Sequence, residues 1–526
     1  MASVDLGDAF VTYSVARTRP DGVRSFECVL PSRPARTEAV FRRASPEGDA
    51  PLLRTLAART SRLTLVSFDA EGTGFKDPTP AVPVGGNTGT TLGQQRFNAV
   101  KFAADIWANA LDSPVEIRVG IRFVPSPCTQ DFTVLGFSQN SEAFMDFPAA
   151  EFPGTWYPVA LANRRAGRDL HPDDGTLGSY DASLGYNDLD KPPCSAIARW
   201  YYGLDGAHGE KVDLVRLTLH ELAHALGFTT YANSATGAEF LGHPDIFERH
   251  VFDLSVRKHW HEMNDAERMR SATNAPFVVW DGGAVTAAAP SVLNRGVPIL
   301  NAPAVLAGDR EVGSADFGPP APAAGVSGPL AAARTSQSDP CSPLANAPEV
   351  AGAVVLADLA RLPCLWVTQV FNAQSAGARA VLLADYNDGG LPPPITLVSA
   401  DPGVTISSVS VTKADGAALR AALASGMVSV SLRLDRNRLR GADPSGLVRL
   451  YAPSPFDSSA IGHFDFSARP PLLMNPFQGA SQDETQSLDL TVAALRDIGW
   501  YPDSASREGM TPVHLPHMPR TEPPRK

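Results

Sequence analysis

This 526-residue sequence has no uninterrupted apolar run of about 18 residues, the length that a membrane-spanning helix requires. It also lacks a basic excess, since 45 Lys and Arg stand against 56 Asp and Glu, a formal net charge of −11. A nucleic-acid-binding protein needs a basic face, so we expect no nucleic-acid partner. Hydrophobic residues make up 44% of the chain, enough for a sizeable core. Its length indicates about three domains. Its composition excludes a fibrous or wholly disordered protein.

Cysteine is also scarce, and the five residues are too few for a disulfide scaffold and too scattered for a paired CxxC metal site. In an exported chain we expect two bridges, Cys341–Cys364 and Cys128–Cys194, with Cys28 as the odd thiol. In a reducing cytosol all five would stay thiols. No signal peptide is visible, because the first thirty residues lack a basic start followed by an apolar core. We nevertheless expect a secreted or extracellular protein.

Hydrophobic periodicity predicts a mixed α and β start to the chain. Strands are expected at 63–68 and 115–124, and the apolar spacing between them predicts a helix over 94–111. Residues 138–205 look irregular, and a second helix is expected from Asp213, a suitable N-cap, to about residue 227. We therefore predict an α+β fold.

That second helix carries a recognisable chemical pattern, HELAHALGF at residues 220–228. His220 and His224 are four residues apart, so one helix face directs both imidazoles toward one point, where they can share a zinc ion. Glu221 then lies beside the metal, where a carboxylate can take a proton from an activated water. A chance HExxH is the alternative, but this one lies within a predicted, mostly apolar helix.

A catalytic zinc ion needs a third protein ligand and one open position. Gly227 matches the glycine of the metzincin pattern HExxHxxGxxH, whereas Thr230 stands where the third histidine would be. Two solutions remain open: a downstream glutamate, as in thermolysin-like peptidases, or a late histidine beyond an insertion. The available glutamates are Glu239, Glu248 and Glu262, and the histidines that compete for the late position are His243, His250, His259 and His261.

The segment SSAIGHFDFSARPPLLMNP, residues 458–476, favours the late histidine. His463 is followed by Met474 in a Pro-flanked apolar turn, and metzincins place a methionine-bearing turn beneath the zinc. Together with HExxHxxGF, the arrangement resembles the leishmanolysin-like metzincins, although Ile461 and Gly462 stand where that family has Gly-Ser. The resemblance implies that His220, His224 and His463 are zinc ligands, Glu221 the catalytic base, Gly227 the structural turn and Met474 the Met-turn.

A domain must be inserted between His224 and His463, because the intervening stretch is far too long for a loop. Within it, 353–385 reads as two buried parallel strands joined by a helix that ends at Gly377. The pattern NAQSAGA at 372–378 resembles the protease-associated (PA) domain, and 406–423 fits that family's next strand and helix. The resemblance implies a Cys341–Cys364 pair and a module that binds or gates peptidase substrates without catalytic residues.

The resulting organisation has five parts. They are an N-terminal segment that could be a prosegment (1–62), the first part of a catalytic domain (63–285), an inserted α/β PA domain (286–435), the second catalytic part with the third ligand (436–503), and a disordered tail (504–526). Metzincins are often made with a propeptide whose cysteine fills the open zinc position. That resemblance gives Cys28 a switch role, against the plainer reading of an incidental thiol.

We therefore expect a zinc-dependent endopeptidase that acts on protein or peptide substrates through a metal-activated water. The substrate is expected to lie extended against an edge strand, which 183–189 would supply. The alternatives are a PA-domain binding module with a structural or inactive metal site, and a thermolysin-like peptidase with a glutamate ligand. Calcium is conceivable in the Asp/Gly-rich loops, but no ordered ligand spacing supports it.

Overall fold

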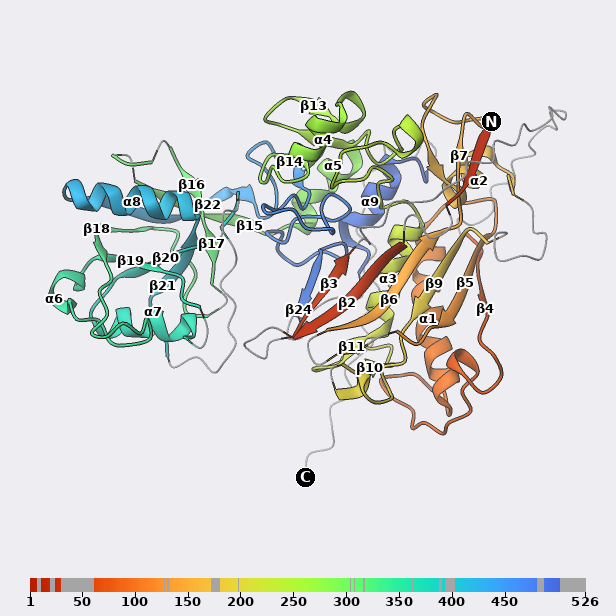
Figure 1. Cartoon of the computed structure of the whole chain (residues 1–526), viewed down its shortest axis with the longest axis horizontal. Helices are drawn as coiled ribbons and strands as arrows, with labels where there is room; N and C mark the ends of the chain where they lie inside the picture. The colour runs from red at the N-terminus through yellow and green to blue at the C-terminus, as the bar shows by residue number, and fades with distance from the viewer. Residues whose placement is uncertain are drawn as a thin grey trace.

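The computed structural model shows two bodies. The inserted segment forms the smaller lobe on the left of Figure 1, and the rest of the chain forms the larger body. The residues described are 1–6, 11–18, 24–29, 61–126, 128–129, 132–171, 180–196, 198–302, 304–306, 308–315, 317–361, 364–386, 390–392, 403–479 and 487–501. The expected tail, 504–526, lies outside them. No helix in this described part of the chain is long and apolar enough to cross a bilayer.

The larger body is built on a seven-stranded mixed sheet. Its strands, in spatial order, are β24 (Phe477–Gly479), β3 (Arg24–Val29), β2 (Val11–Thr18), β6 (Phe132–Asn140), β9 (Ala182–Tyr186), β5 (Ile117–Phe123) and β4 (Leu63–Ser67). The two predicted strands are thus present as β4 and β5, paired in parallel. Strand β6 runs antiparallel to both β9 and β2.

Two long helices cover this sheet. Helix α1 (Leu92–Ala110) begins where the Thr91 hydroxyl accepts a hydrogen bond from the Gln94 N–H, and it packs against α3 (Leu214–Ala225). Asp213 caps α3 as predicted, accepting hydrogen bonds from the next two free amides of the helix. Helix α3 in turn packs on β6, which places its buried face directly beneath the sheet.

The inserted lobe contains an eight-stranded sheet with helices on both faces. In spatial order its strands are β16 (Arg310–Glu311), β15 (Arg295–Asn301), β22 (Ser429–Leu439), β18 (Val326–Ala332), β19 (Val354–Asp358), β20 (Ala380–Ala384), β21 (Ser407–Val411) and β17 (Gly313–Ser314). The run β18–β19–β20–β21 is parallel, as predicted for buried strands. Two separate apolar clusters lie on its faces, one including α7 (Trp366–Ser375) and one including α8 (Lys413–Ser425).

The remaining elements are short. Strands β1 (Ala2–Asp5), β7 (Glu142–Met145) and β8 (Tyr157–Pro158) form one sheet, and β13 (Lys258–His259), β12 (Val251–Asp253), β14 (Val278–Trp280) and β23 (Val448–Arg449) form another. A parallel pair joins β10 (Trp200–Tyr201) to β11 (Val212–Asp213). The other helices are α2 (Val159–Ala166), α4 (Asp265–Ser271), α5 (Gly283–Val292), α6 (Ala347–Val350) and α9 (Asp489–Asp497).

Some expectations about organisation need correction. Region 138–205 is not wholly irregular, since it holds β7, α2 and β9; these elements are short and carry no long periodic pattern. Segment 183–189 does not supply a sheet edge, because β9 is paired on both sides, to β5 and β6. The inserted domain was expected over 286–435, but its sheet begins at Arg295 and ends at Leu439. Helix α5, which overlaps the start of the expected range, packs on α9 in the larger body.

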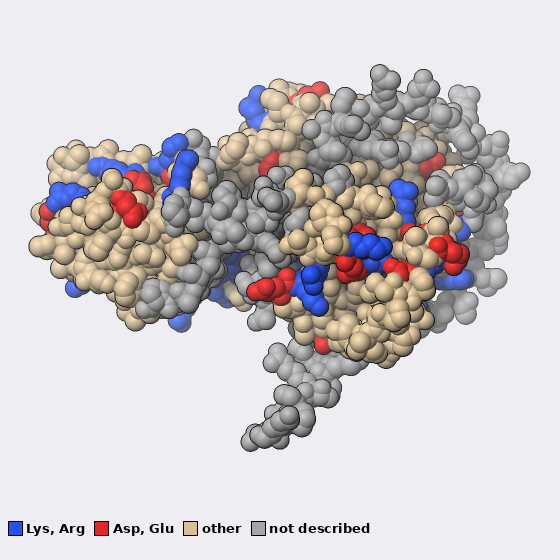
Figure 2. Space-filling model, turned by 60° about the horizontal axis from the view of Figure 1, so that its bottom comes forward, with Lys and Arg blue, Asp and Glu red and all other residues tan. Residues whose placement is uncertain are grey.

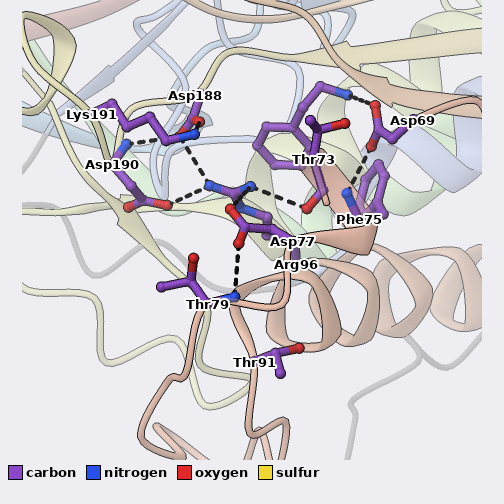
Figure 3. Close-up of polar contacts among 12 residues, drawn as sticks. Asp69, Thr73, Phe75, Asp77, Thr79, Thr91, Arg96, Asp188, Asp190 and Lys191 are labelled. Atoms are coloured by element: carbon purple, nitrogen blue, oxygen red, sulfur yellow. Dashed lines mark hydrogen bonds and ion pairs between the residues drawn. The ribbon is translucent and has the colours of Figure 1, made fainter. Parts of the chain in front are cut away.

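A buried arginine links α1 to the loops at the end of the sheet (Figure 3). The guanidinium of Arg96 donates to Asp188 and Asp190, at 3.0 and 2.8 Å, and lies 3.7 Å from a carboxylate oxygen of Asp77. Tyr202 completes the cluster, with its hydroxyl 3.1 Å from Nε of Arg96. Because Arg96 is fully buried, the carboxylates around it compensate a charge that would otherwise be costly to bury.

Both predicted disulfides are formed, Cys128–Cys194 in the larger body and Cys341–Cys364 in the inserted lobe. Cys28 is the free thiol, and it is buried. On the face shown in Figure 2, acidic and basic side chains are interspersed and much of the surface is uncharged. This distribution accords with a chain in which charged residues are only 19% of the total.

Candidate metal centre and active site

Helix α3 presents both motif histidines from one buried face. His220 and His224 are 2% and 3% exposed, and their Nε2 atoms lie 3.2 Å apart. The i, i+4 spacing brings the two rings together as predicted. After one further turn the chain leaves the helix at Gly227, whose φ of +114° few other residues adopt. A Cβ there would lie 3.0 Å from Ile498 and 3.1 Å from Pro158, so the glycine is also needed for space.

His463, which follows the inserted lobe in the sequence, joins this pair in space. Its ring centroid lies 5.4 Å from that of His220 and 5.0 Å from that of His224. The turn that contains Met474 holds the same cluster: the carbonyl of Leu473 is 2.8 Å from Nδ1 of His220, and the carbonyl of Met474 accepts a hydrogen bond from the Phe464 N–H. Met474 itself is fully buried. The structure therefore brings the predicted Met-turn next to the three histidines.

The backbone selects the tautomer of all three rings when they are neutral. Nδ1 lies 2.8 Å from the Leu473 carbonyl in His220, 2.7 Å from the Phe228 carbonyl in His224, and 2.8 Å from the Ser459 carbonyl in His463. A carbonyl only accepts, so each Nδ1 carries the proton and each Nε2 presents a lone pair. Within the described residues, Nε2 of His463 has no hydrogen-bond partner.

Cys28 supplies a fourth donor to the same point. Its Sγ lies 3.6 Å from Nε2 of His224, and the donor atoms of Cys28, His220, His224 and His463 all lie within 4.8 Å of one another. Ligand bonds of about 2.05 Å to nitrogen and about 2.3 Å to sulfur would place tetrahedral donors about 3.3 Å (N···N) and about 3.6 Å (N···S) apart. The observed 3.2 and 3.6 Å match both values, so these residues fit a zinc ion.

Electrostatics favour neutral imidazoles at this cluster. Burial lowers the pKa of His224 to about 4, and burial together with the neighbouring rings lowers the pKa values of His220 and His463 well below their ordinary range. Burial raises the pKa of the Cys28 thiol, and the charge of Glu221 raises it further. Three neutral imidazoles with their lone pairs converging are a donor set that suits zinc.

Glu221 lies beside the cluster rather than in it. Its side chain is fully buried, which raises its pKa to about 7, while a hydrogen bond from Ser14 opposes the shift. The hydroxyl of Ser14, on β2, donates directly to a carboxylate oxygen of Glu221. Nothing in the sequence singled out Ser14, because its proximity depends on β2 pairing with β6 from far away in the chain.

The competing ligands lie elsewhere, held in other contacts. Thr230 donates to Asp245, Glu248 accepts from the Asp245 N–H, Glu239 is ion-paired with Arg268, and Glu262 accepts from the His259 N–H. Neither these glutamates nor His243, His250, His259 and His261 share a cluster with the α3 pair in the part of the chain that the structure describes. The geometry therefore favours the late histidine over the glutamate ligand.

Comparison with known proteins identifies one domain. Residues 326–419 match the family model of the PA domain, so the inserted lobe contains a PA domain. No curated protein matches the chain. Solved structures that align in part include a zinc aminopeptidase from Bacillus subtilis (23% identity, 27% of this chain and 31% of that one, TM-score 0.22) and an aminopeptidase from an Aneurinibacillus species (19%, 28% and 31%, 0.21).

A third partial alignment is to a peptidase M28 precursor from Shewanella amazonensis, with 14% identity over 42% of this chain and 51% of that one and a TM-score of 0.21. This chain thus spans less than a third of the length of the first two structures. Similarity of this extent does not define the fold or the chemistry of the larger body. The evidence on its activity is the geometry described above.

Proposed function

We propose that this chain is a zinc-dependent endopeptidase of the metzincin type, similar to the leishmanolysin-like group, and that the structure represents its latent form. The observation that carries the proposal is the convergence of three Nε2 lone pairs beside a buried glutamate. His220, His224 and His463 would hold the zinc ion. A zinc ion bound there supplies a Lewis acid and lowers the pKa of a water molecule.

The chain's own groups supply the remaining steps of peptide hydrolysis. Glu221 is one residue from a ligand and outside the donor set, so its carboxylate can accept the proton of the attacking water and pass it to the leaving amine. In this form of the chain, where Ser14 covers the carboxylate, burial raises the pKa of Glu221 to about 7.

The N-terminal segment gives the proposal its latent state. Cys28 supplies the fourth donor atom of the cluster, and the hydroxyl of Ser14 donates a hydrogen bond to the carboxylate of Glu221. Strand β2 is hydrogen-bonded along β6, so with β2 and β3 gone β6 would become a free sheet edge. An extended peptide can add to such an edge by main-chain hydrogen bonds. Strands β2 and β3 thus cover the candidate metal site, the base and the β6 edge together, as expected of a prosegment.

The PA domain and the disulfides bear on how substrates reach the proposed site and on where the protein acts. We propose that the PA domain modulates access of protein or peptide substrates. Two disulfides outside any redox motif accord with an extracellular protein.

A second candidate is a binding protein with a structural zinc site, favoured by the closed set of four protein donors, which is typical of structural zinc. A structural site has no use for a carboxylate at position 221. The test is Glu221→Ala, assayed for zinc content and for hydrolysis of an unfolded protein after the N-terminal segment is released. We expect retained zinc with hydrolysis reduced at least about a thousandfold. Zinc bound by a wild-type chain without hydrolysis would favour the binding protein.

A further inference from the structure

The inserted lobe is linked to the larger body by an ion pair of bidentate geometry. Glu311, on β16, accepts hydrogen bonds from both terminal nitrogens of Arg449, at 2.8 and 2.9 Å, and a third from Arg438 at 2.7 Å. Arg449 belongs to β23 of the larger body and is 3% exposed. Figure 1 shows β16 and β22 on the side of the lobe that faces the larger body.

The backbone around Arg449 holds the segment that contains His463. The carbonyl of Arg449 accepts from the Asp465 N–H at 2.9 Å, and the Tyr451 N–H donates to the carbonyl of His463, also at 2.9 Å. The Ile461 N–H donates to the carbonyl of Tyr451 at 2.7 Å. Residues 449–451 therefore form a short ladder with 461–465. This ladder places the third histidine.

The arginine is costly to bury without its partner. Burial alone would lower the pKa of Arg449, but the hydrogen bonds and charge of Glu311 raise it above its ordinary value. Removing the carboxylate would leave a buried guanidinium to seek another partner. The His463 segment is one of the elements that could respond, because it is bonded to the strand of Arg449 and the buried Asp465 acts on the same arginine. The segment 441–443 is another, because the Arg449 N–H donates to the carbonyl of Gly441 and the charge of Asp443 also acts on Arg449.

We infer that Glu311 of the inserted lobe is a positioning residue for the metal centre, acting through Arg449 on the ladder that holds His463. The inference rests on the proposed function, since it takes His463 as a zinc ligand. It gives the inserted lobe, which contains the PA domain, a physical connection to the proposed catalytic site. Anything that displaces β16 would then weaken the metal site.

The test measures zinc affinity of the full-length protein by competition with a chromophoric chelator. Glu311→Gln removes the charge at nearly constant volume. The matched control is Asp309→Asn, two residues away in the same lobe, whose carboxylate pairs with Arg433 within that lobe. Changes to groups that orient metal ligands typically cost about 10–100-fold in affinity. We expect Glu311→Gln to weaken zinc binding at least about tenfold and Asp309→Asn to change it less than about twofold.

Substitution of cobalt for zinc provides a second readout. A displaced His463 would weaken the visible absorption of tetrahedral Co²⁺ in Glu311→Gln, which a purely structural link between lobes would not do. If Glu311→Gln does not fold, Glu311→Asp keeps the charge but shortens the reach and serves in the same comparison. Wild-type zinc affinity in Glu311→Gln, or equal losses in both variants, would overturn the inference. A wild-type chain that binds no zinc would instead overturn the proposed function.

Discussion

The position of His463 favours one of the two ligand sets that the sequence allows. Its Nε2 lacks a hydrogen-bond partner among the described residues, which is expensive for a buried polar atom unless a cation is bound there. The alternative glutamates are engaged elsewhere, Glu239 with Arg268 for example. A metal centre built on the α3 pair would thus depend on a residue that follows the inserted lobe in the sequence.

Replacement of this histidine tests that dependence. We predict that His463→Ala lowers zinc affinity at least about a hundredfold, because a direct ligand is lost rather than a group that orients one. Chelator competition on the purified protein measures it. His259→Ala is the matched control, since His259 pairs with Asp281 outside the cluster and its loss should leave zinc affinity unchanged. Equal affinities in the two variants would contradict the ligand assignment.

Cys28 carries the prediction about latency. Cys28→Ser replaces a thiolate ligand by a poorly coordinating hydroxyl, so the fourth corner of the donor set opens. We predict that hydrolysis of an unfolded protein by the full-length chain rises at least about tenfold, equivalent to about 1.4 kcal/mol of barrier. The double variant with Glu221→Ala should show no rise. Zinc loss without a gain in activity would instead identify a structural site.

At the scale of elements, the end of α3 must turn sharply for the Phe228 carbonyl to reach His224. We predict that Gly227→Ala lowers the free energy of unfolding by about 2–4 kcal/mol, because backbone strain adds to crowding against Ile498 and Pro158. Gly167→Ala is the control: its φ is +66° and nothing lies within 4 Å of the added Cβ, so only about 1 kcal/mol is expected. Urea unfolding measures both. Equal costs would show that the space around Gly227 is unimportant.

The packing of helix α1 against the neighbouring loops depends on its buried arginine, Arg96. Arg96→Met leaves the carboxylates of Asp188 and Asp190 without their buried partner, and we predict a loss of about 3 kcal/mol in the free energy of unfolding. Lys101→Met, on the same helix, breaks only an exposed pair with Asp105 and should cost less than about 0.5 kcal/mol. Similar midpoints for the two variants in urea would refute the role given to the cluster in Figure 3.

The elements that the sequence predicted are those with local signals. Asp213 caps α3 and the histidine spacing follows from the helix period, so both could be predicted from a few neighbouring residues. The parallel strands of the inserted lobe were predictable from their continuous apolar runs. Strand β2 and its Ser14 were not, because their place depends on pairing with β6 across more than a hundred residues. The same holds for the link between Glu311 and Arg449.

For the whole molecule, the cluster of candidate metal donors joins three stretches of chain that are remote in sequence: β3 with Cys28, helix α3, and the segment around His463. A ligand that binds only the folded state stabilises it, by about 4 kcal/mol when present at a thousand times its dissociation constant. We therefore predict that a strong chelator lowers the Tm of the wild-type protein by several degrees. The Tm of His463→Ala should not respond to the chelator. A wild-type Tm that is indifferent to chelation would contradict the centre's role in the fold.

The most direct test of the account is an anomalous diffraction map of zinc-loaded crystals, collected at the zinc absorption edge. The account predicts one strong peak at about 2.0–2.1 Å from Nε2 of His220, His224 and His463 and about 2.3 Å from Sγ of Cys28. A peak ligated by a glutamate in place of His463, or no peak between the two histidines of α3, would contradict it.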